Sequence, residues 1–359
     1  MKSRVLLATA LAAAALAPTA AAAPGLLLGI DDDSLGWYAH TGSLLSIYRD
    51  LGIGAVRVTL AWSPGESFPA GEERTELQRA ATAGLSIRVV LAVTGPASSP
   101  PVDPAGRASY CGFVANVLTR FPWIHDVAIW IEPNSARFWQ PQQGAPAAYE
   151  ALLGQCWDAL HAVRPDANVI ATSAPHANPG RWYADLGKAY RASGRTLPIF
   201  DTIGHDAYPQ SSAEAPGAHH KGKPMDEGDL DRLLAALHKA FDGSGQPVPG
   251  QGGVTVWYLE DGFQSVPPAA VDGLYSGTET DKHPVSEDEQ AAQLTAAVEL
   301  AYCQPAVGAF FNFELRDESA LSGWQSGLLR PDWSAKPAFV SYLEAVAAAD
   351  AGTITCKSQ

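Results

Sequence analysis

Short apolar runs alternate with longer amphipathic stretches along almost the whole chain. The runs are rich in Val, Ile, Leu and Ala, which is typical of strands buried on both faces of a parallel sheet. The expected strands lie at residues 25–30, 55–62, 85–92, 127–130, 168–173, 200–208, 254–260 and 307–314. The stretches with helical periodicity lie at residues 43–51, 72–83, 108–120, 147–163, 182–193, 229–241, 286–303 and 337–348. Strands and helices that alternate eight times predict an α/β protein with a single (β/α)8 TIM barrel.

An open, doubly wound sheet is the competing architecture. Such a sheet usually carries a glycine-rich phosphate-binding loop after an early strand. Neither Gly-x-Gly-x-x-Gly nor Gly-x4-Gly-Lys occurs in this chain, and no linker-like stretch or repeat divides it. We therefore expect one barrel domain over residues 24–359.

Residues 1–23 have the pattern of a secretory signal peptide. Lys2 and Arg4 precede an apolar segment at 5–17, and a run of small residues leads to Pro24. The apolar segment is too short to cross a bilayer comfortably, and no later stretch is long and apolar enough. We expect a secreted, extracellular protein that is cleaved just before Pro24 and has no membrane anchor.

Composition and charge exclude several classes of partner. The chain has 359 residues, of which 47% are hydrophobic, enough for a large core, and its formal net charge is -14 without any basic cluster. Nucleic acid is therefore not an expected partner, because phosphate binding requires clustered positive charge. Nothing in the sequence sets an oligomeric state, so a monomer is the default expectation.

The four cysteines predict two disulfides, because exported proteins fold in an oxidising compartment. Three pairings are possible. Pairing neighbours along the chain gives Cys111 with Cys156 and Cys303 with Cys356. No Cys-x-x-Cys and no histidine cluster with metal-ligand spacing is present, and His219 and His220 lie in a polar loop that we expect to be exposed. We therefore expect neither a metal nor a cofactor.

Candidate chemistry begins at the end of the fourth strand. The apolar run 127–130 leads into Glu132, and Pro133 ends the strand because proline cannot donate to a sheet and biases its predecessor towards extended backbone. A carboxylate is thus presented at the C-terminal edge of the barrel, where active sites of this fold lie. For a lone glutamate, a structural ion pair with Arg137 is the simpler interpretation.

A second glutamate changes that interpretation. Glu260 ends the seventh strand in the same way, and strands four and seven stand across the barrel mouth from each other. Two converging carboxylates are suited to glycosidic bond cleavage, in which one protonates the leaving oxygen and the other attacks the anomeric carbon or activates water. Asp206, Asp261 and Glu314 compete with Glu260 for the second role, and Glu314 is the strongest because it also ends a strand.

These motifs resemble the retaining (β/α)8 glycoside hydrolases of clan A, the cellulase-like superfamily. Trp-Ile-Glu-Pro-Asn at 130–134 is similar to the acid/base motif of the clan, and Trp-Tyr-Leu-Glu-Asp-Gly at 257–262 to its nucleophile motif. The segment 327–338 resembles the region that often follows strand eight. The resemblance implies that Glu132 is the acid/base and Glu260 the nucleophile.

The resemblance also suggests substrate-binding residues, each with a structural alternative. Arg57 would hold the nucleophile ionised, or form an ion pair with Asp31 or Asp33. His205 and Tyr208 would contact sugar hydroxyls or the nucleophile, although His205 could equally be a core histidine. Trp62, Trp139 and Trp324 could stack on sugar rings or pack in the core, and His176 is a weaker candidate.

One position departs from the clan. Ile131 replaces the asparagine that usually bonds the sugar 2-hydroxyl, a contact that strengthens in the transition state. Asn134 is the nearest polar substitute, unless its side chain caps the loop. We therefore expect a retaining hydrolase of a β-linked poly- or oligosaccharide. A non-catalytic glycan-binding protein on the same barrel is the main alternative, and a transglycosylase that uses the same two carboxylates is the third.

Overall fold

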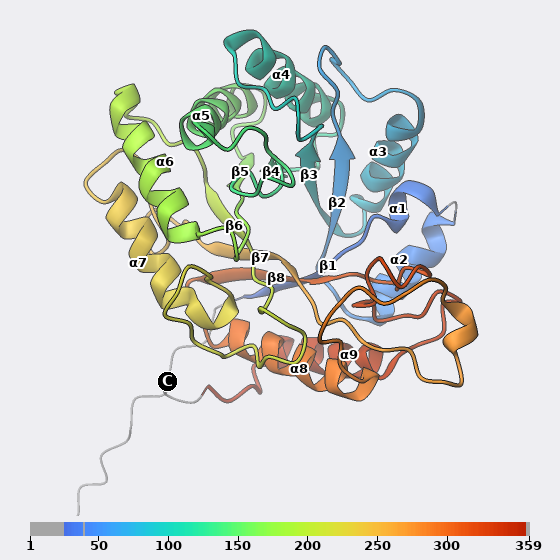
Figure 1. Cartoon of the computed structure of the whole chain (residues 1–359). Helices are drawn as coiled ribbons and strands as arrows, with labels where there is room; N and C mark the ends of the chain where they lie inside the picture. Colours follow the sequence, from blue (N-terminus) through green and yellow to red (C-terminus); the bar gives the residue numbers. More distant parts are fainter. Residues whose placement is uncertain (1–24, 39, 357–359) are drawn as a thin grey trace, which may run out of the picture.

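Eight parallel strands close into a barrel that is surrounded by helices (Figure 1). The structure is a computed structural model that describes residues 25–38 and 40–356, so the expected signal peptide lies outside the described residues. The strands are β1 (Leu27–Asp31), β2 (Ala55–Ala61), β3 (Arg88–Thr94), β4 (Asp126–Ile129), β5 (Asn168–Ala171), β6 (Thr202–Asp206), β7 (Val256–Asp261) and β8 (Val307–Phe313). Each pairs in parallel with its sequence neighbours, and β1 closes on β8. The predicted TIM barrel is confirmed.

The helices follow the strands in the order that the periodicity predicts. The described α-helices are α1 (Ser34–Trp37), α2 (Thr41–Asp50), α3 (Gly71–Ala83), α4 (Pro104–Arg120), α5 (Ala145–Val163), α6 (Pro179–Ser193), α7 (Leu230–Phe241), α8 (Glu287–Tyr302) and α9 (Pro337–Asp350). Two short 3-10 helices, η1 (Glu227–Asp229) and η2 (Asp272–Leu274), lie in loops. The third strand begins three residues later than expected, because Leu85 is an exposed residue of the turn after α3.

The hydrophobic core has two parts. The larger part lies between the strands and the helices, and the smaller one fills the barrel interior with side chains from β2, β3, β4, β5, β7 and β8. Small and large residues complement each other there: a Cβ on Gly204 would lie 2.4 Å from the Leu259 side chain, and one on Gly29 would lie 2.6 Å from Phe311. At both positions the side chain of a neighbouring strand fills the space that a larger residue would need.

Both disulfides join the neighbours that the sequence analysis paired. Cys111 of α4 is bonded to Cys156 of α5, and Cys303 after α8 is bonded to Cys356 near the C-terminus. These bonds tie adjacent helices of the outer layer and fasten the chain end to the barrel. Among the described residues, no helix combines the length and the apolarity that crossing a membrane requires.

Candidate active site

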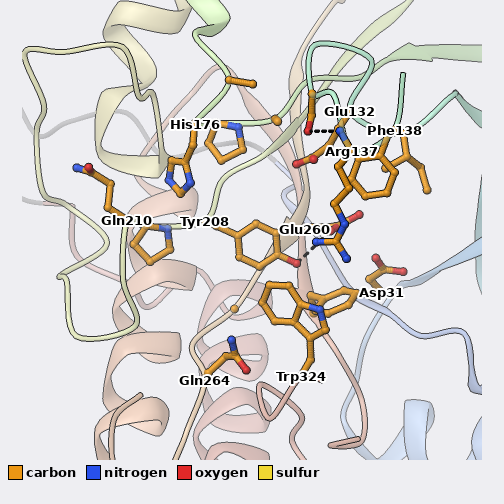
Figure 2. Close-up of a pocket in the computed structure, with 18 of the residues that line it drawn as sticks. Asp31, Glu132, Arg137, Phe138, His176, Tyr208, Gln210, Glu260, Gln264 and Trp324 are labelled. Carbon is orange, nitrogen blue, oxygen red and sulfur yellow. Dashed lines mark hydrogen bonds between the residues drawn. The ribbon is translucent and has the colours of Figure 1, made fainter. Parts of the chain in front are cut away.

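A pocket of about 840 Å³ opens at the C-terminal ends of the strands. Figure 2 shows its lining, with Glu132 and Glu260 on different walls and Trp324 on a third. The lining combines strand-end residues with residues of the long loops after β4, β6, β7 and β8. Its polar and charged members are Asp31, Arg57, Thr59, Thr94, Glu132, Ser135, Arg137, His176, Tyr208, Gln210, Ser211, Ser212, Glu260, Gln264, Thr280 and Asp281.

Glu260 is held by one donor on each carboxylate oxygen. Arg57 Nη2 lies 2.8 Å from Oε1, and the Tyr208 hydroxyl donates to Oε2 over 3.0 Å. Both donors stabilise a negative charge and fix the side chain in one orientation. The Glu260 side chain is only 15% exposed, so most of this charge is shielded from bulk water.

Arg57 serves two carboxylates at once. Its guanidinium also pairs with Asp31 of β1, so both interpretations offered for this arginine describe contacts that are present. Burial alone would lower the pKa of Arg57, but the charges of Asp31 and Glu260 more than offset that and raise it. The guanidinium therefore remains a cation beneath the pocket floor.

Glu132 has a different environment from Glu260. Burial and the negative charge of Glu260 raise the pKa of Glu132 to about 7, while Arg137 and a hydrogen bond with Asp206 oppose the rise. A carboxyl group with this pKa carries its proton for part of the time at neutral pH and can both donate and accept one. The two glutamates thus lie in different environments: an arginine and a tyrosine hydroxyl contact Glu260, whereas burial and a neighbouring negative charge act on Glu132.

The backbone around Glu132 is irregular. Trp130 has φ 65° and Glu132 has φ 38°, a region that residues other than glycine rarely adopt. The indole of Trp130 donates to the Phe138 carbonyl over 2.7 Å, and its backbone N–H is 2.9 Å from the carbonyl of Val93. These contacts hold the strand end in a strained shape that turns the Glu132 side chain into the pocket, and such strain is characteristic of functional sites.

Asp206 lies behind the two glutamates and does not line the pocket. It is 1% exposed, and burial followed by the charges of Glu260 and Glu132 raises its pKa well above the ordinary value. A protonated Asp206 lets three carboxyl groups approach one another without three like charges. This residue was considered as a rival nucleophile, but its position makes it a buried partner of Glu132.

Aromatic rings form one side of the pocket. Trp324 is stacked on Tyr208, with centroids 5.5 Å apart and planes 26° apart, and Phe313 meets Trp324 edge to face at 5.1 Å. Phe138 lines the pocket near Arg137, as Figure 2 shows. Aromatic faces beside polar groups suit a ligand with alternating apolar and hydroxyl-bearing surfaces, as sugar rings have.

The structure corrects two of the predicted substrate contacts. Trp62 is 2% exposed and packs against Tyr110 and Trp130 with ring centroids 5.3 and 6.5 Å away, so it belongs to the core. His205 is completely buried, with Ser173 Oγ 2.9 Å from one ring nitrogen and the Met225 carbonyl 2.8 Å from the other. Neither residue lines the pocket, because tertiary packing covers both.

Asn134 is the third correction. Its side chain bonds the backbone of Ala174 twice, as an acceptor at 2.8 Å and as a donor at 2.9 Å. The amide therefore joins the loops after β4 and β5, and Asn134 does not line the pocket. Ile131 does line the pocket, as does Thr94, whose Oγ1 is buried and has no hydrogen-bond partner.

The other rival nucleophiles lie outside the pocket. Asp261 is 1% exposed and interacts with the buried Glu227. Glu314 lines a neighbouring cavity with Asp32 and Arg316. Glu260 is the only one of the four candidate partners of Glu132 that lines the same pocket. Two other carboxylates, Asp31 and Asp281, also line it.

Several lining residues had no role in the sequence analysis. Phe138, Gln210, Gln264 and Asp281 reach the pocket from loops after β4, β6 and β7. Loop residues have no periodicity that assigns them a direction, so only the order of loops around the mouth could have suggested them. The only group of metal-ligand type found among the described residues, Glu214, His220 and Asp226, lies outside the pocket lining.

Comparison with solved structures finds the same fold in glycoside hydrolases. A family 39 glycoside hydrolase from the gut symbiont Bacteroides cellulosilyticus aligns over 89% of this chain and 63% of its own length, with TM-score 0.65 and 18% identity. The GH39 enzyme from Xanthomonas axonopodis pv. citri aligns over 90% of this chain and 67% of its own, with TM-score 0.58 and 18% identity. A fungal β-1,4-galactanase aligns over 88% of this chain and 98% of its own, with TM-score 0.59 and 15% identity.

Sequence comparison adds no family. No protein-family model and no curated protein matches the chain. The chain spans about half the length, or less, of the β-galacturonidases and β-glucuronidases whose structures it also resembles. At identities of 10–18% these likenesses show the fold alone: this chain has the (β/α)8 architecture that glycoside hydrolases of several families share.

Proposed function

We propose that the protein is a secreted retaining glycoside hydrolase that cleaves a β-linked poly- or oligosaccharide. The observation that carries the proposal is the pair Glu132 and Glu260 in one pocket with opposite electrostatic environments. Glycosidic hydrolysis needs one carboxyl group that holds a proton and one that stays ionised. The two disulfides suit an extracellular location, since such bonds persist in oxidising compartments.

The mechanism follows from these assignments. Glu260 attacks the anomeric carbon while Glu132 gives its proton to the leaving oxygen, so that a glycosyl–enzyme ester forms as the glycosidic bond breaks. Glu132, now ionised, takes a proton from a water molecule, whose oxygen attacks the same carbon and releases Glu260. Arg57 and Tyr208 orient the nucleophile, and Trp324 provides a face on which a sugar ring can stack.

A glycan-binding protein without turnover is the second candidate, and one observation favours it. Neither Ile131 nor Asn134 offers a donor or acceptor to a sugar 2-hydroxyl, because the first is apolar and the second is bonded to Ala174. Loss of that contact would remove several kcal/mol from transition-state stabilisation. In an active enzyme another polar residue of the pocket lining would have to supply this contact.

Labelling with activated 2-fluoro glycosides of several sugars separates the candidates. Peptide mass spectrometry of the wild type is expected to find the sugar on Glu260, and Glu260→Ala is expected to abolish the adduct. Glu314→Ala is the matched control, because Glu314 lines the neighbouring cavity and should leave labelling intact. An adduct on Glu314 would overturn the nucleophile assignment. Glycan binding without any adduct would support the binding protein.

A further inference from the structure

Three side chains of metal-ligand type converge in the segment between β6 and η1. Glu214, His220 and Asp226 each offer one ligand atom, and these atoms all lie within 4.8 Å of one another. The His220 side chain is only 14% exposed, although the sequence suggested a solvent-exposed residue, whereas His219 is 53% exposed. None of the three lines the pocket described above.

Each ring nitrogen of His220 lies within hydrogen-bond distance of a carboxylate oxygen. Nδ1 lies 2.9 Å from Asp229 Oδ2, and Nε2 lies 3.0 Å from Glu214 Oε1. Asp229 is completely buried and also accepts from the backbone N–H of His220 and from Arg232, so its orientation is fixed. A neutral imidazole has one N–H. When that N–H points to Asp229, the Nε2 lone pair faces Glu214, and a metal ion could bind to both groups.

Asp226 is a buried carboxylate without hydrogen-bond partners beside His220. It is 3% exposed, and neither of its carboxylate oxygens has a hydrogen-bond partner. Oδ2 lies 3.0 Å from His220 Nδ1, but the single proton of that nitrogen is directed to Asp229. A proton on Nε2 would hydrogen-bond to Glu214 and would leave both oxygens of Asp226 without a partner. A divalent metal ion could bind to Glu214 and to Asp226 at the same time.

We propose that Glu214, His220 and Asp226 bind one divalent metal ion of the Zn²⁺ type. One imidazole nitrogen and two carboxylate oxygens are ligands that zinc accepts, whereas Ca²⁺ and Mg²⁺ take oxygen ligands. Asp229, which holds Nδ1, is the carboxylate partner that orients a metal-binding histidine. Zinc bonds are about 2.0–2.2 Å long, so the three side chains must draw together by about an ångström. All three lie on one loop segment, which can tighten in this way.

A metal ion at this site would stabilise the pocket-lining residues 210–212. Glu214 uses its other oxygen, Oε2, to accept the backbone N–H of Gln210 over 2.8 Å. Gln210 and its neighbours Ser211 and Ser212 line the pocket, and Tyr208 at the start of this segment bonds Glu260. The metal ion would therefore have a structural role, and its binding is independent of whether the pocket hydrolyses, or only binds, a glycan.

Calorimetric titration of the untagged, chelator-treated mature protein with ZnCl2 tests the proposal. We expect binding of one Zn²⁺ per chain and a rise in the thermal unfolding midpoint, whereas CaCl2 is expected to do neither. Glu214→Gln and Asp226→Asn should each weaken zinc binding at least tenfold. His219→Gln is the matched control, because this neighbouring histidine is not one of the three ligands, and it should keep the wild-type affinity.

Three results would overturn the proposal. They are a wild-type protein that binds no Zn²⁺, an affinity that Asp226→Asn leaves unchanged, and an equal loss of affinity in His219→Gln. The first would show that the three side chains hold no metal ion and only bond to one another. If the variants fail to fold, the comparison of Zn²⁺ with Ca²⁺ on the wild type still decides. No sugar is present in this titration, so its failure is distinct from a failure of 2-fluoro glycoside labelling.

Discussion

Removing the charge of Glu260 should lower the pKa of Glu132. The pKa of Glu132 is raised to about 7 by burial first and by Glu260 second, so Glu260→Gln takes away one of the two causes. In general, two like unit charges about 4 Å apart repel each other by about 1 to 4 kcal/mol, depending on the effective dielectric constant. That range corresponds to roughly one to three pKa units. Because burial is the larger cause, we expect a fall of about one unit.

The measurement is a pH titration of the side-chain carboxyl carbons by NMR, with Glu132→Gln used to assign the signal. The same fall would accompany formation of a glycosyl–enzyme ester, which neutralises Glu260, and would convert Glu132 from an acid into a base. Glu314→Gln is the control, since Glu314 is not among the groups that shift Glu132. An unchanged pKa of Glu132 in Glu260→Gln, or an equal shift in Glu314→Gln, would refute the assignment of the two glutamates as a coupled pair.

Three further changes have defined outcomes. The raised pKa of Glu132 means that its contribution to stability is present below about pH 4.5 and is lost as the pH rises through about 7. We therefore expect the free energy of unfolding of Glu132→Gln, measured with urea, to rise relative to that of the wild type by up to about 3 kcal/mol from pH 4 to pH 8. A difference between the two proteins that does not change with pH would contradict this. Tyr208→Phe removes a donor to Glu260 and should slow 2-fluoro glycoside labelling about 10- to 100-fold with unchanged circular dichroism, while an unaltered rate would exclude a role for the hydroxyl. His205→Ala removes a buried imidazole together with its hydrogen bonds to Ser173 and to the Met225 carbonyl. Ser173 keeps the Tyr183 hydroxyl, but the carbonyl loses its side-chain partner, so the free energy of unfolding should fall by at least about 2 kcal/mol. A weakened glycan affinity without loss of stability would instead restore His205 as a sugar contact.

Periodicity and proline placement were sufficient to predict the fold and the positions of both glutamates. The eight alternations predict a parallel sheet covered by helices, and the missing glycine-rich phosphate loop favours the closed barrel over an open sheet. In such a barrel a residue that ends a strand must lie at the mouth, and this places Glu132 and Glu260 without knowledge of any contact. Neighbour pairing of the cysteines succeeded because consecutive helices are adjacent in the outer layer.

The tertiary structure decided which polar and aromatic side chains reach the pocket. Trp62 and Trp324 look equivalent in the sequence, yet Tyr110 of α4 and the neighbouring Trp130 cover the first, while the second faces the pocket. His205 and Tyr208 are three residues apart, and only Tyr208 points at Glu260. The physical reason is that exposure at a strand end depends on segments brought over it from elsewhere in the chain, and those contacts have no local signature.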